Sequence, residues 1–303
     1  MAQFRTRKAP LDGVLLIDKP EGFTSHDVVA RVRRQVRPAV KKVGHAGTLD
    51  PFATGLLVVL VGRATKLARF FVDLPKEYEC TLRFGVRSDT GDLTGDLSET
   101  GESTTREAIE AVLPDFLGVV VQQVPMTSAA KVDGERLYKK AHRGEVVETP
   151  VKEVHIDAID ILEFDAVAQT MLCRVSCSKG TYVRQLAIDI GEALGAGAHL
   201  VQLARTATGD LRLDDAQTLA AFEEAVAACD AGDERIPGLV DPAAALQFMP
   251  GIELSAAQVT AVRNGARLPG GPPEPVRLTY RGELIAIYGP AEEGRGLKLL
   301  VKL

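Results

Sequence analysis

The stretch from Gly44 to Gly55, which reads GHAGTLDPFATG, most constrains what this chain can fold into. It holds three glycines, one proline, one histidine and one aspartate within twelve residues. Glycine permits positive φ angles and a close ligand approach, and Pro51 fixes the backbone directly after Asp50. The sequence therefore predicts a loop of tightly specified shape that carries a carboxylate. An Asp before Pro is also a common turn element, and no Gly-Lys-Ser/Thr ending is present, which excludes a phosphate-binding P-loop.

Apolar segments flank this loop on both sides. Gly13–Asp18 predicts a short buried strand that ends in the turn Lys19–Gly22. Thr24 or Ser25 can cap the helix that follows. After the loop, Gly55–Val61 is apolar and too short for anything but a buried strand or the start of a helix.

Further along the chain, strand-like and helix-like patterns alternate. Strands are expected at 78–84, 154–164 and 171–176, and helices at 104–113, 181–194 and 216–228. Residues 122–153 combine prolines and glycines with six Lys/Arg. This stretch predicts an extended insertion with one short helix near Leu137–His142.

The pattern of apolar and turn-forming residues changes near Gly251. A short helix over 255–264 is expected there, followed by Gly/Pro-rich turns and strands at 276–280, 283–288 and 298–302. These patterns predict a small β-rich domain over residues 249–303, separate from a larger domain over 1–248, with the boundary in the linker 238–250.

Composition limits the class of protein. No apolar run approaches a membrane span, and the basic start lacks the apolar stretch of a secretory signal. Four scattered cysteines without a C-x-x-C pair argue against a zinc site and a disulfide framework, and for reduced thiols in the cytoplasm. The net charge is -5, yet residues 1–50 hold ten basic against five acidic residues. This distribution permits RNA binding without proving it.

The loop Gly44–Gly55 resembles the catalytic loop of the TruB family, the tRNA pseudouridine-55 synthases. The resemblance continues in the correct order from residue 13 to about residue 210. One departure is His26, where other members carry Asn. The further matching motifs are Gly13–Asp27, Lys76–Tyr78, Arg87–Asp92, Gln123–Pro125, Ser128–Lys131, Cys177–Arg184 and Gly197–Leu200.

This resemblance implies an α/β (α+β) fold. Residues 1–248 would form a pseudouridine synthase catalytic domain, with a mixed, mostly antiparallel central sheet flanked by helices. Residues 122–153 would be its RNA-gripping insertion. Residues 249–303 would form a PUA-like RNA-binding domain.

The implied reaction is isomerisation of the uridine at position 55 in the T-loop of tRNA. It breaks the N1–C1′ bond, turns the uracil, joins C5 to C1′ and releases the C5 proton. No cofactor or metal is needed, because no atoms are gained and no electrons are exchanged. The expected partner is the T-arm of tRNA, bound by a monomer without an obligatory protein partner.

The resemblance assigns the catalytic residues Asp50, Arg184 and Tyr78. An ionised Asp50 could attack the ribose, attack the base or remove a sugar proton, and the sequence does not choose among these routes. Arg184 would orient the carboxylate and favour its charged form. Tyr78 would stack on the uracil and help remove the C5 proton.

The other implied site residues bind the substrate. His45 would enter the T-loop near the position that the flipped-out base leaves. Tyr182 and Leu203 would line the pocket, and Asp92 would either contact the substrate or support Arg184. The cations of residues 131–143 and of the N-terminal helix would neutralise phosphates and make binding sensitive to salt.

Three other functions compete with this hypothesis. The first is an RNA-folding or RNA-binding protein whose catalytic loop is vestigial. The second is a hydrolase that uses Asp50 with His45, although no third orienting group is apparent. The third is a pseudouridine synthase with another target uridine.

Overall fold

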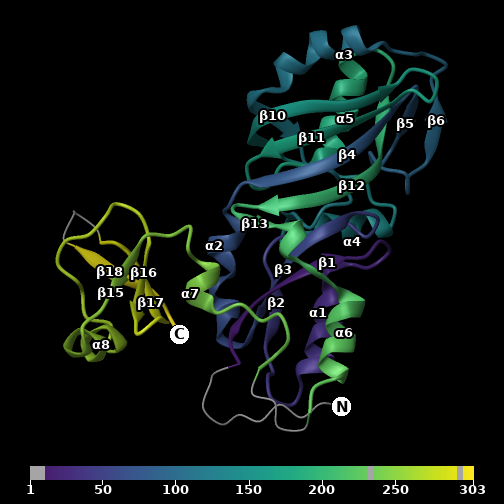
Figure 1. Cartoon of the computed structure of the whole chain (residues 1–303). Helices are drawn as coiled ribbons and strands as arrows, with labels where there is room; N and C mark the ends of the chain where they lie inside the picture. Colours follow the sequence, from purple (N-terminus) through teal and green to yellow (C-terminus); the bar gives the residue numbers. More distant parts are fainter. Residues whose placement is uncertain (1–10, 231–234, 292–295) are drawn as a thin grey trace. The chain divides into compact units, whose positions relative to one another are not determined.

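The chain divides into two compact units in a computed structural model that describes residues 11–230, 235–291 and 296–303 (Figure 1). The first unit takes the chain up to Pro51, then Gly55–Val72 and Gly209–Leu303. The second unit takes Phe52–Thr54 and Asp73–Thr208. Each unit therefore joins segments that lie far apart in the sequence.

The first unit is built around strand β1, which lies between two other strands. It pairs with β3 antiparallel, with Leu16 opposite Val58, and with β14 in parallel. A short strand, β2, also pairs with β3 antiparallel. The strands are β1 (Gly13–Lys19), β2 (Val43–His45), β3 (Thr54–Val61), β13 (Leu211–Arg212) and β14 (Gln217–Thr218). The helices are α1 (Ser25–Val36), η1 (Gly62–Leu67), α2 (Ala68–Val72), η3 (Leu213–Asp215), α6 (Leu219–Ala227) and α7 (Pro242–Ala245).

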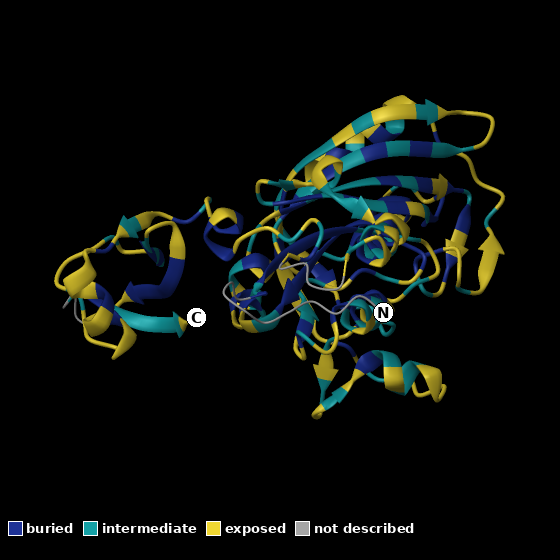
Figure 2. Cartoon of the chain, turned by 60° about the horizontal axis from the view of Figure 1, so that its bottom comes forward, coloured by how far each residue is buried: buried dark blue, intermediate teal, exposed yellow. Residues whose placement is uncertain are grey.

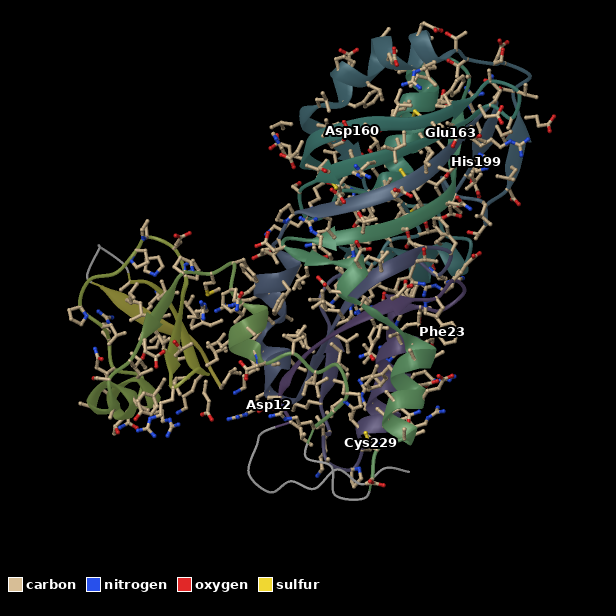
Figure 3. All side chains as sticks on the ribbon, viewed as in Figure 1. Asp12, Phe23, Asp160, Glu163, His199 and Cys229 are labelled. Atoms are coloured by element: carbon tan, nitrogen blue, oxygen red, sulfur yellow. The ribbon has the colours of Figure 1, made fainter. Side chains whose placement is uncertain are left out.

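Helix α1 begins where the sequence offers a cap. Thr24 accepts from the backbone N–H of Asp27, and the Asp27 carboxylate accepts from the backbone N–H of Thr24, which is a capping box. The apolar face of α1 is fully buried against β1, β3 and α6, and each buried valine contributes about 1.5 kcal/mol or more. Phe23 and Cys229 pack at the edge of this core (Figure 3). Asp12, at the start of β1, binds Arg63 across the unit's surface (Figure 3).

The second unit contributes five antiparallel strands to the sheet, in the order β12-β4-β11-β10-β7. Helix α5 packs against β12. Along β4 and β11 the buried positions are interspersed with half-buried ones, whereas β10 has many exposed positions (Figure 2). The strands are β4 (Lys76–Phe84), β7 (Gly118–Gln123), β10 (Val151–Asp165), β11 (Thr170–Cys177) and β12 (Ala198–Thr208). The smaller elements are β5 (Val86–Ser88), β6 (Leu97–Glu99), α3 (Arg106–Val112), η2 (Leu113–Phe116), β8 (Lys131–Val132), β9 (Glu135–Arg136), α4 (Leu137–His142) and α5 (Val183–Ala193).

The end of the chain forms a four-stranded sheet with helix α8 packed on it. The order is β15-β16-β17-β18, and its apolar cluster contains only residues between 252 and 299. Tyr288 lies at its centre, and its hydroxyl donates to the carbonyl of Ala266 at 2.9 Å. The elements are β15 (Gly251–Glu253), α8 (Ala256–Arg263), β16 (Val276–Tyr280), β17 (Glu283–Pro290) and β18 (Leu297–Lys302).

The predicted fold class is confirmed. The protein is α/β (α+β) with helices and a mixed, mostly antiparallel sheet, and its C-terminal part is β-rich. The helix of the insertion spans Leu137–His142, as the sequence predicts. The two ends of the predicted insertion belong to β7 and β10, because residues 122–123 pair with residues 151–152. The domain boundary at residues 248/249 stays a prediction.

Candidate active site

The loop that carries Asp50 connects β2 to β3 in the first unit. Its first residues continue the pairing of the two strands, because the N–H of Ala46 donates to the carbonyl of Val58 at 2.9 Å. Gly47 and Gly55 both have φ near +98°, a conformation that a side chain would strain. Two of the three glycines thus shape the turn as the sequence predicts.

Ser25 fixes the residue directly before Asp50. Its hydroxyl accepts from the N–H of Leu49 at 2.8 Å and donates to the carbonyl of Leu49 at 3.2 Å. Ser25 is buried in the first turn of α1, so water does not compete for these bonds. Thr24 caps α1, which leaves Ser25 available to hold the loop.

Lys19 fixes the residue directly after Asp50. Its side chain is fully buried, and Nζ donates to the carbonyls of Phe23 at 2.6 Å, Pro20 at 2.9 Å and Pro51 at 3.2 Å. A buried ammonium group is tolerated only with hydrogen bonds of this kind. Since the carbonyl of Pro51 also accepts from the N–H of Gly22 at 2.8 Å, the turn Lys19–Gly22 and the loop form one structure.

Lys19 and Ser25 hold the loop, but the sequence analysis assigned neither residue a role in the site. The signal for Lys19 is a lysine two residues after the apolar segment Val14–Ile17 and directly before Pro20, where a solvated charge is unexpected. Ser25 carries no such signal, because its partner Leu49 lies 24 residues away.

Arg184 lies in the first turn of α5 in the second unit and is 3 % exposed. Its Nη1 donates to the carbonyl of Thr90 at 3.0 Å and to the hydroxyl of Thr127, and lies 3.4 Å from Oδ2 of Asp92. The partners come from two loops, so α5 and both loops must fold before the guanidinium is held. Arg184 is therefore not an ordinary solvated arginine on a helix surface.

Asp92 is buried beside Arg184 and held from its own loop. Its Oδ1 accepts from the N–H of Thr94 at 2.9 Å, from the Thr94 hydroxyl and from the Thr90 hydroxyl at 2.9 Å. Breaking a buried pair by removing one partner costs about 3–5 kcal/mol. Of the two roles expected for Asp92, this geometry fits support of Arg184.

Tyr78 and Leu203 come from neighbouring strands. Tyr78 on β4 lies opposite Arg205 of β12, and Leu203 of β12 lies opposite Cys80 of β4. Residues directly opposite in an antiparallel pair share one face of the sheet. Leu203 is buried and Tyr78 is half-buried, so the tyrosine retains an accessible part.

Tyr182 is positioned through its backbone directly before α5. The amide of Gln122 accepts from the N–H of Tyr182 at 3.0 Å and donates to its carbonyl at 3.2 Å. Gln122 is fully buried at the end of β7, next to the start of the insertion. The sequence drew attention to Gln123 and missed Gln122.

Lys76 is a buried cation two residues before Tyr78. Burial, followed by the nearby charge of Arg205, lowers the pKa of Lys76 to about 8. Arg205 is itself 1 % exposed. The sequence assigned no role to either residue, because a charged residue in a strand pattern normally points to water.

The insertion holds fewer available cations than its sequence suggests. Arg143 binds Glu135 at 2.8 Å and Glu145 at 2.7 Å, and both carboxylates raise the pKa of Arg143. Within the ranges that the structure describes, no carboxylate pairs with Lys131 or Lys139. These two lysines fit the expected phosphate contacts better than Arg143 does.

The expected site residues thus fall into two groups. Asp50 and His45 belong to the first unit, and His45 is half-buried in β2 opposite Val59. The second unit brings Arg184 and Asp92 together, and it also holds Tyr78, Tyr182 and Leu203.

Other chemistry finds little support in the described part of the chain. No group of three or more His, Cys, Asp or Glu residues there could hold a metal ion. All four cysteines are described and none forms a disulfide, although the sulfurs of Cys80 and Cys173 lie 3.5 Å apart across β4 and β11. Among the described helices, none has the length and apolar character to cross a membrane.

Two family models match the chain. Residues 33–183 match the TruB family pseudouridylate synthase N-terminal domain, and residues 184–246 match the tRNA pseudouridylate synthase B C-terminal domain. The tRNA pseudouridine synthase B of Ralstonia nicotianae is 44% identical over 98% of this chain and 92% of its own length. That of Burkholderia pseudomallei strain 668 is 46% identical over 85% of this chain and 83% of its own length.

Solved structures share the fold. A chain of a Cbf5-Nop10-Gar1 complex superposes with a TM-score of 0.73 at 24% identity, covering 100% of this chain and 91% of that one. A chain of an archaeal box H/ACA sRNP Nop10-Cbf5 complex gives 0.71 at 25% identity, covering 99% and 92%.

Proposed function

The chain belongs to the TruB family of pseudouridylate synthases, and we propose that it converts the uridine at position 55 in the T-loop of tRNA to pseudouridine, with Asp50 as the catalytic carboxylate. Isomerisation of a tRNA uridine is the activity of its curated relatives, which match this chain over most of their length. The choice of position 55 and the roles of individual residues are part of the proposal.

The observation that carries the proposal is the pair of buried contacts on either side of Asp50. Ser25 holds Leu49 and Lys19 holds Pro51, so the backbone is fixed at both neighbours of the carboxylate. A group fixed in advance need not be ordered during the reaction, which lowers the entropic part of the barrier. Neither contact uses the side chain of Asp50, which is the arrangement expected of a catalytic group.

Every proposed route requires an ionised Asp50, and a cation lies close to its loop. Nζ of Lys19 donates to Pro51, the residue next to Asp50, and brings a buried positive charge to the loop. In the proposal, Arg184 is the second cation, and it orients the carboxylate through its fixed guanidinium plane. Asp92 and Thr127 hold that plane in place.

The remaining proposed site residues contact the uracil base and the T-loop. Tyr78 stacks on the uracil and helps to remove the C5 proton, and Tyr182 and Leu203 line the pocket. His45 takes the place of the flipped-out base in the T-loop, which offsets a cost of a few kcal/mol for extruding it. The half-buried state of Tyr78 supports its role, because a stacking ring must expose one face.

The decisive experiment is chemical mapping of pseudouridine in unmodified tRNA after incubation with the protein. We expect modification at position 55, and none with Asp50→Asn, which should fold and bind tRNA like the wild type. Asp27→Asn is the matched control, since it removes the same charge from exposed Asp27 on α1 and should keep full turnover. Normal turnover by Asp50→Asn would remove Asp50 from the mechanism.

The same assay separates the competing functions. Modification at a different uridine would change the target but not the chemistry. Release of free uracil from the RNA would indicate a hydrolase. Rescue of misfolded tRNA by Asp50→Asn, with no pseudouridine formed by the wild type, would indicate an RNA-folding protein.

A further inference from the structure

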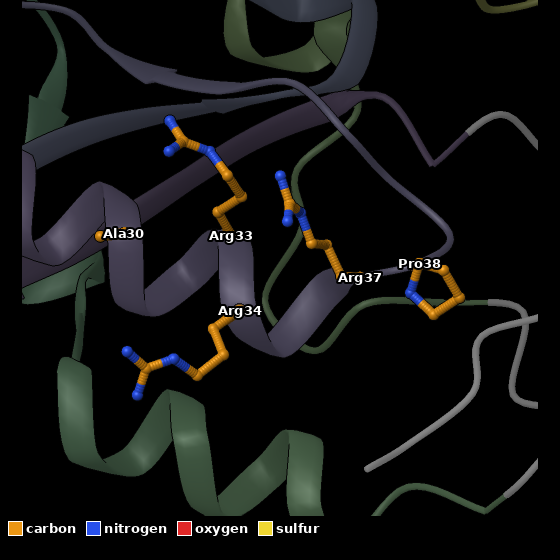
Figure 4. Close-up of a pocket in the computed structure, with 5 residues that line it drawn as sticks. All are labelled: Ala30, Arg33, Arg34, Arg37 and Pro38. Carbon is orange, nitrogen blue, oxygen red and sulfur yellow. The ribbon is translucent and has the colours of Figure 1, made fainter.

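The motif Gly197–Leu200 matches the family, yet the proposed function gives it no role. Its histidine, His199, is 2 % exposed in the second unit (Figure 3). The cations at the end of α1, of which Figure 4 shows Arg33, Arg34 and Arg37, already have an expected role as phosphate contacts. A buried histidine needs a hydrogen-bond partner, so the partner of His199 indicates what the motif does.

His199 holds one carbonyl in place at the start of β5. Its Nδ1 lies 3.1 Å from the carbonyl oxygen of Val86. A carbonyl oxygen only accepts, so Nδ1 carries the hydrogen and donates it. Both residues are buried, and water therefore does not compete for this bond. The bond joins β12 to residues 85–92, which we call the Asp92 segment.

Other residues of the motif contact the same segment. The carbonyl of Gly197 accepts from the N–H of Gly85 at 3.1 Å. The N–H of Leu200 donates to the carbonyl of Gly91 at 3.0 Å, and Leu200 also forms an isolated parallel bridge with Asp92. The start of β12 therefore supports the Asp92 segment along its length.

The Asp92 segment also contacts α5. Gly91 has a φ of +76°, and a side chain there would come within 3.1 Å of the carbonyl of Arg184. Nη1 of Arg184 donates to the carbonyl of Thr90 at 3.0 Å and lies 3.4 Å from Oδ2 of Asp92. A shift of the segment on β12 would therefore move two groups that hold the guanidinium.

A surface ion pair joins the same segment to α5 but explains less. Arg87 binds Glu192 through two hydrogen bonds of 2.7 and 2.9 Å. The two side chains are 47% and 50% exposed, and ion pairs exposed to solvent contribute little to stability. We therefore expect the buried bond of His199 to fix the segment more firmly.

We propose that His199 is a positioning residue of the pseudouridine synthase reaction. Through Val86 it holds the Asp92 segment where Thr90 and Asp92 fix the guanidinium of Arg184. This inference rests on the proposed function, in which Arg184 orients the catalytic carboxylate. In this role His199 affects the chemical step and leaves tRNA binding unchanged.

The test replaces His199 with three other residues and measures kcat and KM for tRNA at a temperature at which the variants are folded. His199→Leu removes the donor and should lower kcat by about tenfold or more at an unchanged KM. The amide nitrogen of Asn can take the place of Nδ1, whereas that of Gln reaches the place of Nε2. His199→Asn should therefore keep most of the wild-type kcat and His199→Gln should not. This pair decides the test even if His199→Leu does not fold.

Two further variants separate positioning from a general weakening of the fold. Glu192→Ala breaks the surface ion pair with Arg87 and should keep the wild-type kcat. In Asp92→Asn, one group that holds Arg184 is already altered. Adding His199→Leu to that variant should cost much less than it does in the wild type, because residues that act through one another are not additive.

The outcomes are distinct. If the wild type forms pseudouridine, a normal kcat for His199→Leu, a change confined to KM, or equal kcat losses for His199→Asn and His199→Gln would overturn the positioning role and leave the proposed function intact. Equal losses from His199→Leu with and without Asp92→Asn would also overturn it, because the effect would not pass through Asp92. A wild type that forms no pseudouridine would overturn the proposed function and this inference with it.

Discussion

Thr24 and Ser25 are neighbours at the start of α1, yet their hydroxyl groups have different roles. Thr24 caps the helix, whereas Ser25 holds Leu49 beside Asp50. We expect Ser25→Ala to lower kcat by about tenfold or more, because a loop shift of 1 Å can cost that much. Thr24→Ala should cost about 1 kcal/mol of stability and leave kcat unchanged.

The measurement is steady-state pseudouridine formation together with thermal unfolding of both variants. A kcat loss shared by Thr24→Ala would show that α1 as a whole, and not the contact with Leu49, controls the loop. The sequence allowed either residue as the cap. It could not separate them, since the deciding contact joins residues 24 positions apart.

Lys76 gives a prediction about pH. Its pKa in the folded protein is about 8, below its ordinary value of 10.5, because burial disfavours the charge. Between these values the unfolded chain binds more protons, so the free energy of unfolding rises with pH through this window. Between pH 7 and pH 10 the free energy of unfolding of the wild type should rise by about 2 kcal/mol more than that of Lys76→Met.

Denaturant unfolding of both proteins at pH 7 and pH 10 measures this difference. If the unfolding free energy of Lys76→Met rises by the same amount between the two pH values, other titrating groups cause the rise. Arg205→Met offers a check. Removing the neighbouring charge should raise the pKa of Lys76 and so reduce the rise in unfolding free energy between pH 7 and pH 10.

At the scale of elements, β12 is the longest strand that the sequence failed to predict. Its pairing with β4 shifts twice, between Leu200 and Gln202 and between Arg205 and Ala207. Each bulge moves one residue out of the alternation, so the apolar pattern with a period of two is lost. Elements with an unbroken period were predicted well, among them α1 and β11, because a local pattern is enough to specify them.

The junction of β7 with α5 supports a prediction at this scale. The amide of Gln122 binds both backbone groups of Tyr182, two residues before Arg184. Gln122→Leu leaves the N–H of Tyr182 without this partner, while the carbonyl keeps its bond from the N–H of Leu186. The variant should lower kcat by about tenfold, with stability reduced by about 1–3 kcal/mol. The adjacent variant Gln123→Leu breaks contacts to Thr149 at the base of the insertion.

We therefore expect Gln122→Leu to act mainly on kcat and Gln123→Leu mainly on KM for tRNA. Steady-state kinetics of both variants at several tRNA concentrations provides the comparison. Equal effects on KM would show that the two glutamines serve only the insertion.

At the scale of the whole molecule, the apolar cores suggest which parts can be separated. The cluster around α1 and the cluster of residues 252–299 share no residue. We expect a chain that ends at Pro250 to unfold cooperatively and to modify a T-arm hairpin at the wild-type rate. Its KM for full tRNA should rise, because the removed strands and α8 carry exposed cations such as Arg263 and Arg281.

Calorimetry and hairpin kinetics check this expectation. A truncated chain that fails to fold would show that the C-terminal sheet stabilises the rest of the first unit. The sequence indicated a β-rich end from its turns and alternating strands. It could not indicate how strongly that end depends on the rest, because this depends on contacts between distant segments.

The way Lys19 and Ser25 hold the loop has a practical consequence. Both side chains bind main-chain atoms of Leu49 and Pro51, and none of these hydrogen bonds involves residue 50. The bonds that Lys19 and Ser25 make should therefore remain when another side chain replaces that of Asp50. Under the proposed function the side chain at position 50 meets the target uridine, so a cysteine or an unnatural amino acid placed there would make the protein a crosslinking probe for its own RNA targets in living cells.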